Sequence, residues 1–154
     1  MLRTALFSAV AALADLVAPL APASAGQKIS APVDQHATSK AFGLFAPADA
    51  LSLNQSSQVG TNLSFGGKYR QRIDAPVDQH ATSKAFSIGG DASATSVNLN
   101  DQQLTNAAVG RRGRQTIDAP VDQTATAKAV SIGGSAEATA VNSNSQVLTN
   151  EASK

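Results

Sequence analysis

Short stretches of strictly alternating side chains cover most of the chain after residue 26. From Thr124 to Ile132, Ala125, Ala127 and Ala129 lie on one face, and Thr, Lys, Val and Ile occupy the alternate positions. Residues 135–141 alternate in the same way. A period of two places successive side chains on opposite faces of a strand. A glycine pair separates the two runs, and another separates the equivalent runs earlier in the chain. The pattern therefore predicts β-strands joined by tight glycine turns.

Alanine is a better helix former than strand former, so a helix is one alternative. Against it, Thr, Ser, Val and Asn fill the positions between the alanines, and proline recurs at Pro32, Pro76 and Pro120. Proline cannot donate to a sheet ladder and belongs at a bend or at the start of a strand. These positions favour strands with proline corners, and a face of alanines suits two closely packed sheets. A chain that is disordered until it assembles is the other alternative.

The alternating segments recur with a fixed 44-residue period. The string Ala-Pro-Val-Asp-Gln begins at Ala31, Ala75 and Ala119. Such self-similarity is typical of repeat proteins, in which each unit stacks on the next. A shorter pattern, Asp/Ser-Gln-x-x-Thr, occurs twice in each unit, so each unit contains two half-repeats. Its six occurrences begin at Asp34, Ser57, Asp78, Asp101, Asp122 and Ser145.

These periods predict an all-β fold, a β-solenoid or cross-β stack of three 44-residue repeats. The units are expected at about 29–72, 73–116 and 117–154. Each unit would supply two half-rungs of about 22 residues, a length that suits one strand–turn–strand element of a stacked β structure. At about 4.8 Å per half-rung, the six half-rungs would make a stack about 29 Å tall.

The N-terminal segment, residues 1–25, has the features of a secretory signal peptide. Arg3 provides a positive start, residues 5–20 are mostly apolar, and Ala23-Ser24-Ala25 forms a small-residue cleavage site before Gly26. Asp15 interrupts the apolar stretch, which argues against a membrane span. An uncleaved amphipathic helix is the alternative. We expect a signal peptide at 1–25, a repeat domain at 26–154, and a secreted location outside the cell or at its surface.

The composition points away from a conventional globular core. Leu, Ile, Val and Phe account for about a fifth of residues 26–154, and there is no cysteine for disulfides or thiolate metal sites. The net charge of +1 gives no reason to expect nucleic acid as a partner, and it leaves little repulsion between copies. A small chain of this kind needs backbone ladders, small-residue packing or oligomerisation for stability.

Amide side chains keep the 44-residue register. In a stack, equivalent positions lie about 4.8 Å apart, so each amide can donate to the next one and accept from the one before. Such ladders stabilise cross-β structure, whereas the alternative interpretation is exposed amides in turns. The predicted ladder and assembly residues are Asn54, Asn98, Asn142, Gln58, Gln102, Gln146, Gln35, Gln79, Gln123, Asn62, Asn106 and Asn150, and the predicted turn residues are Gly89, Gly90, Gly133, Gly134, Pro32, Pro76 and Pro120.

Few residues point to catalysis. His36 and His80 each follow an aspartate by two positions, but Thr124 stands at the third equivalent place. Two histidines without a third ligand make a poor zinc site. No nucleophile elbow, phosphate loop or HExxH motif occurs in the chain. We therefore expect neither enzymatic activity nor a cofactor.

Two features of the chain, its basic segments and its atypical first unit, have more than one interpretation. Basic residues gather at 68–72 and 111–114, where we expect solvated turns whose charges discourage edge pairing; a polyanion or polysaccharide contact and a protease site are the alternatives. In the first unit, residues 45–47 replace the glycine pair. Aromatic residues also concentrate there, at Phe42, Phe45, Phe65 and Tyr69. We expect a capping unit or simple drift, and docking on a partner is the alternative.

The chain resembles the bacterial functional amyloids, the curli major subunit and the Fap fibril subunit. The resemblance rests on a signal peptide, short Gln- and Asn-bearing half-repeats and the absence of cysteine. The parallel to the Gln and Asn positions of curli repeats lies in the series Gln58, Gln102 and Gln146, and Asn62, Asn106 and Asn150. The resemblance implies secretion, a β-solenoid monomer and end-to-end stacking into fibres of a biofilm matrix.

The expected function is that of a secreted structural protein that assembles into extracellular amyloid-like fibres for biofilm formation or adhesion. Both ends of the stack are expected to expose unpaired strand edges. The expected partners are other copies of the chain, together with a nucleator or an outer-membrane secretion component. One alternative is a monomeric module that binds ice or polysaccharide, and another is a disordered secreted coat component. The candidate residues for an ice or polysaccharide surface are Thr82, Thr126, Thr95 and Thr139.

Overall fold

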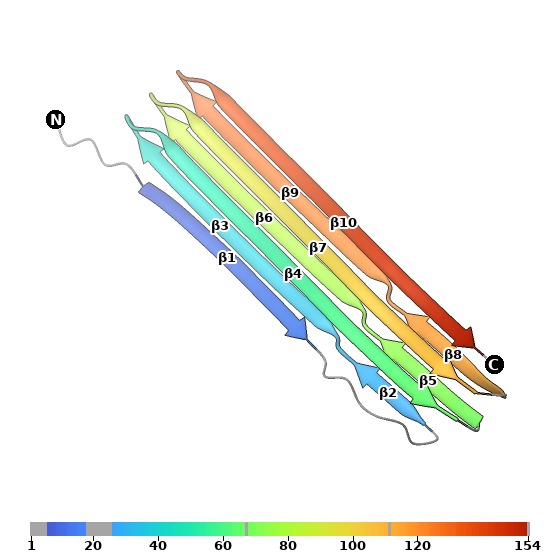
Figure 1. The fold of residues 1–154 in the computed structure, drawn as a ribbon. Coiled ribbons are helices and arrows are strands. Elements are labelled where there is room, and N and C mark those ends of the chain that lie inside the picture. The colour runs from blue at the N-terminus through green and yellow to red at the C-terminus, as the bar shows by residue number, and fades with distance from the viewer. Residues whose placement is uncertain (1–5, 18–25, 67, 111, 154) are drawn as a thin grey trace.

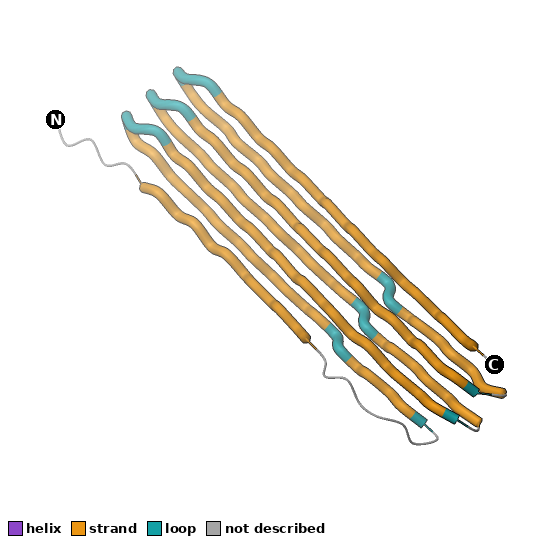
Figure 2. Tube along the Cα trace, in the orientation of Figure 1, coloured by secondary structure: helices purple, strands orange, loops and turns teal. Residues whose placement is uncertain are grey.

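In the computed structural model, the chain forms a flattened β-solenoid with two facing layers of parallel strands (Figure 1). The structure describes residues 6–17, 26–66, 68–110 and 112–153. No helix occurs among these residues, and the strands are interrupted only at short turns and corners (Figure 2). The all-β fold predicted from the alternating pattern is confirmed.

Each 44-residue unit forms one rung of three strands. The first rung contains β2 (Gln27–Ser30), β3 (Val33–Leu44) and β4 (Ala48–Phe65). The second contains β5 (Lys68–Asp74), β6 (Val77–Ile88) and β7 (Ala92–Val109). The third contains β8 (Arg112–Asp118), β9 (Val121–Ile132) and β10 (Ala136–Ser153). One further strand, β1 (Leu6–Val17), precedes the first rung.

The rungs are joined by three parallel sheets with the orders β2-β5-β8, β3-β6-β9 and β1-β4-β7-β10. Between rungs, strand residues pair with the residue one 44-residue unit away, as Val33 does with Val77 and Val77 with Val121. The long strands β4, β7 and β10 pair over their full 18 residues. The predicted stack of three repeats is therefore confirmed.

The two half-repeats of a unit lie in the same rung, facing each other. Strand β3 lies opposite β4, and the Gln35 side chain crosses between the layers to donate to the Gln55 carbonyl. The six expected half-repeats are present, but the expected height of about 29 Å is wrong, because they lie in three rungs spaced about 4.8 Å apart, which occupy only about 14 Å. The physical reason is register: only a step of a whole unit places identical side chains next to one another.

Proline corners separate the sheet β2-β5-β8 from the sheet β3-β6-β9, and the hydrogen bonds between rungs continue through each corner. The Ala31 N–H donates to the Asp74 carbonyl at 2.8 Å, and the Val33 N–H donates to the Pro76 carbonyl at 2.9 Å. Pro32 lies between these two donors and has no N–H to leave unpaired. Each corner therefore bends the chain between β2 and β3, and at the equivalent places, with the loss of a single bond.

The turn between β3 and β4, and the equivalent turn in the other rungs, requires a residue in the left-handed backbone conformation. Gly89 and Gly133 have φ angles of 72° and 82°, and Phe45 adopts 54° at the equivalent position in the first rung. Glycine adopts this conformation freely, whereas a side chain strains it. The glycine that follows meets a second constraint: a Cβ on Gly90 would lie 2.4 Å from the Ala46 carbonyl oxygen. The glycine pair thus provides both the turn and the close approach of successive rungs.

The basic segments are strands, so the prediction of solvated turns is wrong. Residues 68–72 lie within β5 and residues 112–114 begin β8, while Arg111 lies outside the described residues. The parallel register continues through them, from Lys68 opposite Arg112 onwards. Arg72 lies 3.5 Å from the Asp74 carboxylate and 3.6 Å from that of Asp118, so one cation of this row is matched by two anions.

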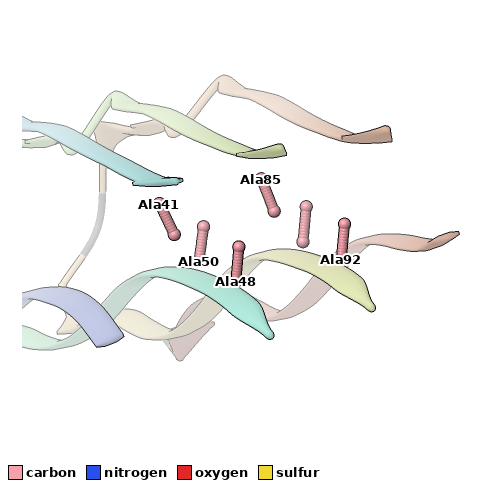
Figure 3. Packing of buried hydrophobic residues seen from close by; sticks show 6 residues of the cluster. Ala41, Ala48, Ala50, Ala85 and Ala92 are labelled. Carbon is pink, nitrogen blue, oxygen red and sulfur yellow. The ribbon is translucent and has the colours of Figure 1, made fainter. Parts of the chain in front are cut away.

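The narrow part of the core contains only small side chains. Ala41 and Ala85 of one layer point toward Ala48, Ala50 and Ala92 of the other, and each is at most 6% exposed (Figure 3). Alanine and serine allow the two backbones to approach closely, as the alanine-rich face predicted.

Several large apolar side chains lie on the outer faces, although Val77 of β6 and Leu104 of β7 are buried. Phe42 is 52% exposed and Ile132 is 58% exposed. The usual arrangement, with large apolar residues inside, is therefore reversed over this part of the stack.

Strand β1 covers part of the outer edge of the first rung. It pairs in parallel with β4, from Leu6 opposite Ala48 to Val17 opposite Val59. The 44-residue step of the repeat would instead place Leu6 opposite Ala50, so β1 does not continue the repeat. The expectation of an unpaired edge at this end is wrong for this stretch of β4, although β2 and β3 are the outermost strands of their sheets. The signal peptide stays a prediction, and Arg3 and the cleavage site lie outside the described residues.

We predict that Ala85→Leu lowers the free energy of unfolding by about 1–3 kcal/mol, because the extra carbons would force the two layers apart. Denaturant titration followed by circular dichroism measures this change. The matched control is Lys84→Leu, which places the same side chain on the outer face of the same strand. Equal stability of the two variants would contradict close packing of the alanine faces.

A second prediction concerns the turns before β7 and β10. The Asp91 carboxylate accepts hydrogen bonds from the Ser135 N–H at 2.9 Å and from the Ser135 hydroxyl at 2.8 Å, which lowers the pKa of Asp91 below 3.8. The stabilisation is therefore present above pH 3.8 and is lost as the pH falls through the lowered pKa. We expect Asp91→Asn to reduce the loss of stability between pH 5 and 2, measured by denaturant titration.

Candidate functional site

A column of asparagine side chains runs through all three rungs between the layers. Asn54 Nδ2 donates to Asn98 Oδ1 at 2.9 Å, and Asn98 Nδ2 donates to Asn142 Oδ1 at 2.9 Å. Each amide also donates across the core to the opposite layer, as Asn54 does to the Gln35 carbonyl at 3.2 Å and Asn98 to the Gln79 carbonyl at 3.2 Å. The column therefore ties the rungs to one another and the layers to one another.

Two glutamine columns have the same form but the opposite direction. Gln79 Nε2 donates to Gln35 Oε1 at 2.7 Å, and Gln123 Nε2 donates to Gln79 Oε1 at 2.7 Å. In the second column, Gln102 donates to Gln58, and Gln146 donates to Gln102. The second column also crosses the core, because these three glutamines donate to the backbone carbonyls of Ala31, Ala75 and Ala119.

A further asparagine column lies near the opposite end of the long strands. Asn62 donates to Asn106 and Asn106 to Asn150, each at 2.9 Å. The same amides reach the carbonyls of Arg72 and Thr116 in the short strands β5 and β8. All four series of predicted assembly residues thus lie in columns within one chain, and their part in assembly between chains stays a prediction.

Two columns were not predicted from the sequence. Ser56 Oγ donates to Asn100 Oδ1 at 2.6 Å, and Asn100 Nδ2 donates to Asn144 Oδ1 at 2.7 Å. Gln115 donates to Gln71, and Gln71 to Gln27. The 44-residue step was visible for both, and the position of Asn100 two residues after Asn98 indicates that it faces the same side. Ser56 stands in the first unit where the later units have Asn100 and Asn144, so the asparagine series is not evident in the sequence.

The amides of the four predicted columns are deeply buried in the first two rungs. Asn54, Asn98, Asn106, Gln79 and Gln102 are all 0% exposed. A buried polar group without a partner costs about 1–3 kcal/mol, so the core is stable only if each amide is bonded. Asn54 Oδ1 is an exception, because it is buried and has no hydrogen-bond partner. The equivalent oxygens of Asn98 and Asn142 each accept from the rung before.

The columns give the two ends of the stack different chemistry. In the asparagine columns the donor points toward the third rung, and in the glutamine columns it points toward the first. Within the described residues, the third rung therefore presents asparagine donors and glutamine acceptors at its outer side. The first rung presents the reverse, with asparagine acceptors and glutamine donors.

The outer faces carry the remaining candidate residues. His36 and His80 stack with ring centroids 5.0 Å apart, and each lies 2.9 Å from the carboxylate of its neighbouring aspartate. The described residues hold no group of three or more His, Cys, Asp or Glu side chains able to bind a metal. The threonines proposed for an ice or polysaccharide surface lie on opposite layers, with Thr82 beside Thr126 in one and Thr95 beside Thr139 in the other. They do not form a common surface.

Comparisons with known proteins add no functional assignment. The chain matches no protein family, no curated protein and no solved structure. Within the part that the structure describes, no helix has the length and apolar character needed to cross a membrane.

We predict that Asn98→Leu destabilises the chain by about 1–3 kcal/mol for each buried group left unpaired, which are an Nδ2 hydrogen of Asn54 and the Gln79 carbonyl. Unfolding in denaturant at low protein concentration measures the change. Asn142→Leu is the matched control, since it removes the same side chain from the outer rung, where water replaces the lost bonds. Equal losses for the two variants would contradict a stabilising column of buried amides.

Proposed function

We propose that the chain is an exported structural protein whose copies stack end to end into extracellular fibres of a biofilm matrix or adhesive coat. The carrying observation is that one 44-residue register joins each rung to the next. Because every rung pairs with the next in the same register, the outer edge of the last rung can pair with another identical rung. Addition of a second copy repeats contacts that the chain already makes internally.

The outer strands of the third rung support this proposal. In the described part of the chain, β8, β9 and β10 are each the last strand of their sheet, so one side of each backbone is unpaired. Proteins that remain monomeric usually protect such edges with short strands, bulges, proline or charge. β10 is 18 residues long and contains only two charged residues, Glu137 and Glu151. This edge is therefore well suited to pair with another strand.

The outer faces are consistent with association side by side or with surfaces. Phe42 stacks on Phe86 with ring centroids 5.6 Å apart, and Leu44 and Ile132 are 50% and 58% exposed. Rows of exposed apolar side chains of this kind indicate an interaction surface. In a fibre these rows would extend along its length and would favour bundling or adhesion.

A monomeric binding module is the main alternative. Its strongest support was the threonine rows, which lie on two different layers. The proposal of export rests on the features of residues 1–25, and a nucleator or outer-membrane secretion component remains a proposed partner.

The proposal predicts that the chain starting at Gly26 gains β signal as its concentration rises and forms unbranched filaments. Circular dichroism and electron microscopy at several concentrations measure both properties. A stable β spectrum without filaments would contradict fibre formation and favour a monomeric binding module. A coil spectrum at every concentration would contradict both the fibre and the binding module.

A further inference from the structure

We infer that the joint between copies continues the 44-residue register, with the third rung of one copy seated on the first rung of the next and Asn142 donating to Asn54. This inference rests on the proposed function and specifies its contact surface. The partner is a second copy of this chain, oriented head to tail. Strand β10 of one copy would occupy the outer edge of β4 in the other.

The unpaired oxygen of Asn54 identifies the missing partner. Its residue is 0% exposed, and its Oδ1 has no hydrogen-bond partner. Asn98 Oδ1, one rung later, is satisfied by an amide N–H from the rung before it. The donor that Asn54 lacks is therefore an asparagine N–H placed one rung before the first.

Among the residues that the structure describes, none supplies this donor to the first rung. The position one repeat length before Asn54 is Val10, and the residue that pairs with Asn54 in β1 is Ala12. Neither amino acid type has a side-chain hydrogen-bond donor. The strand that covers the edge of β4 therefore leaves the acceptor unsatisfied.

The third rung has the required donor. Asn142 uses one hydrogen of Nδ2 to bond the Gln123 carbonyl at 3.0 Å. Its equivalent Asn98 bonds the Gln79 carbonyl in the same way and also donates to the next rung. By this equivalence, Asn142 directs a hydrogen toward a rung that a second copy would supply.

The direction of the columns selects head-to-tail stacking. With the third rung of one copy on the first rung of another, Asn142 donates to Asn54 and Asn150 to Asn62, and Gln58 donates to Gln146. Two third rungs facing each other would place asparagine donors against donors and glutamine acceptors against acceptors. Such an arrangement would leave buried groups unpaired.

The joint requires β1 to leave the edge of β4. Figure 1 places β1 and β10 at opposite edges of the same sheet, so β1 occupies the site that β10 of a second copy would take. Its register differs from that of the repeat by two positions. Removal of the predicted signal peptide, which includes β1, would therefore expose the edge of β4 to which β10 of another copy could pair.

The register and polarity of the joint are tested by crosslinking. The chain has no cysteine, so in the two single variants Gln55→Cys and Ser143→Cys any disulfide must involve the introduced cysteine. Both positions lie on the outer face, and head-to-tail stacking places them in neighbouring strands about 4.8 Å apart, within the range of a disulfide. Fibres grown from an equal mixture, starting at Gly26, are oxidised and separated under denaturing conditions.

We expect crosslinked pairs containing one chain of each variant, and none in fibres of either variant alone. Pairs formed by Ser143→Cys alone would indicate head-to-head stacking and would overturn the inference. Uncrosslinked fibres from the mixture would overturn the proposed register. In both cases fibre formation itself, and with it the proposed function, would stand.

The hydrogen bond is tested by Asn142→Asp. A carboxylate still accepts from Asn98 but cannot donate to Asn54, so we expect elongation of wild-type seeds at neutral pH to slow by about tenfold or more. Below about pH 3.5 the introduced carboxyl is protonated and can donate again, so elongation should recover. Ser143→Asp is the matched control, with the same charge on the neighbouring outer position. Equal rates for the two variants would overturn the inferred bond.

The role of β1 has its own readout. The chain starting at Gly26 should extend wild-type seeds, and the full chain should extend them at least about tenfold more slowly because β1 occupies the edge. Equal rates would overturn the role of β1. Failure of the wild-type chain to form any fibre would instead overturn the proposed function.

Discussion

The structure depends on the hydrogen bond between one side-chain amide and its counterpart one rung away. A primary amide has two donors and an acceptor, and each of these needs a partner once the side chain is buried between the layers. Each column is satisfied only if consecutive rungs present a hydrogen-bonding side chain at the same position along the strand. This requirement explains why the 44-residue step is kept without insertion or deletion. It also explains why a single change in the middle of a column affects two neighbouring rungs.

The amides take a role that large apolar side chains have in most proteins. Alanine and serine line one part of the core, and Asn and Gln fill much of the rest, together with a small apolar cluster around Ile73 and Leu104. Phe42 and Ile132 lie outside. Small side chains bury little apolar area, so the hydrophobic contribution per residue is modest. Cohesion therefore comes largely from backbone ladders and from the amide columns, both of which run along the stack.

Alternation and the 44-residue period were sufficient to predict the strands, the three repeats and the register of Asn98 with its equivalents. They were not sufficient to decide whether two half-repeats stack or face each other, because both arrangements preserve the spacing of the short motif. The basic segments were misjudged because charge and glycine suggest turns, whereas the register of β5 with β8 carries them into a sheet. The column of Ser56, Asn100 and Asn144 was missed because its first member is a different residue type.

The opposed directions of the columns have an electrical consequence. A row of amides that all donate the same way adds its dipoles, as the peptide groups of a helix do. In the part of the chain that the structure describes, three columns donate toward the third rung and three toward the first. Their dipoles oppose one another, so each added rung leaves the net side-chain dipole near zero. A stack built this way can lengthen without accumulating electrostatic strain along its axis.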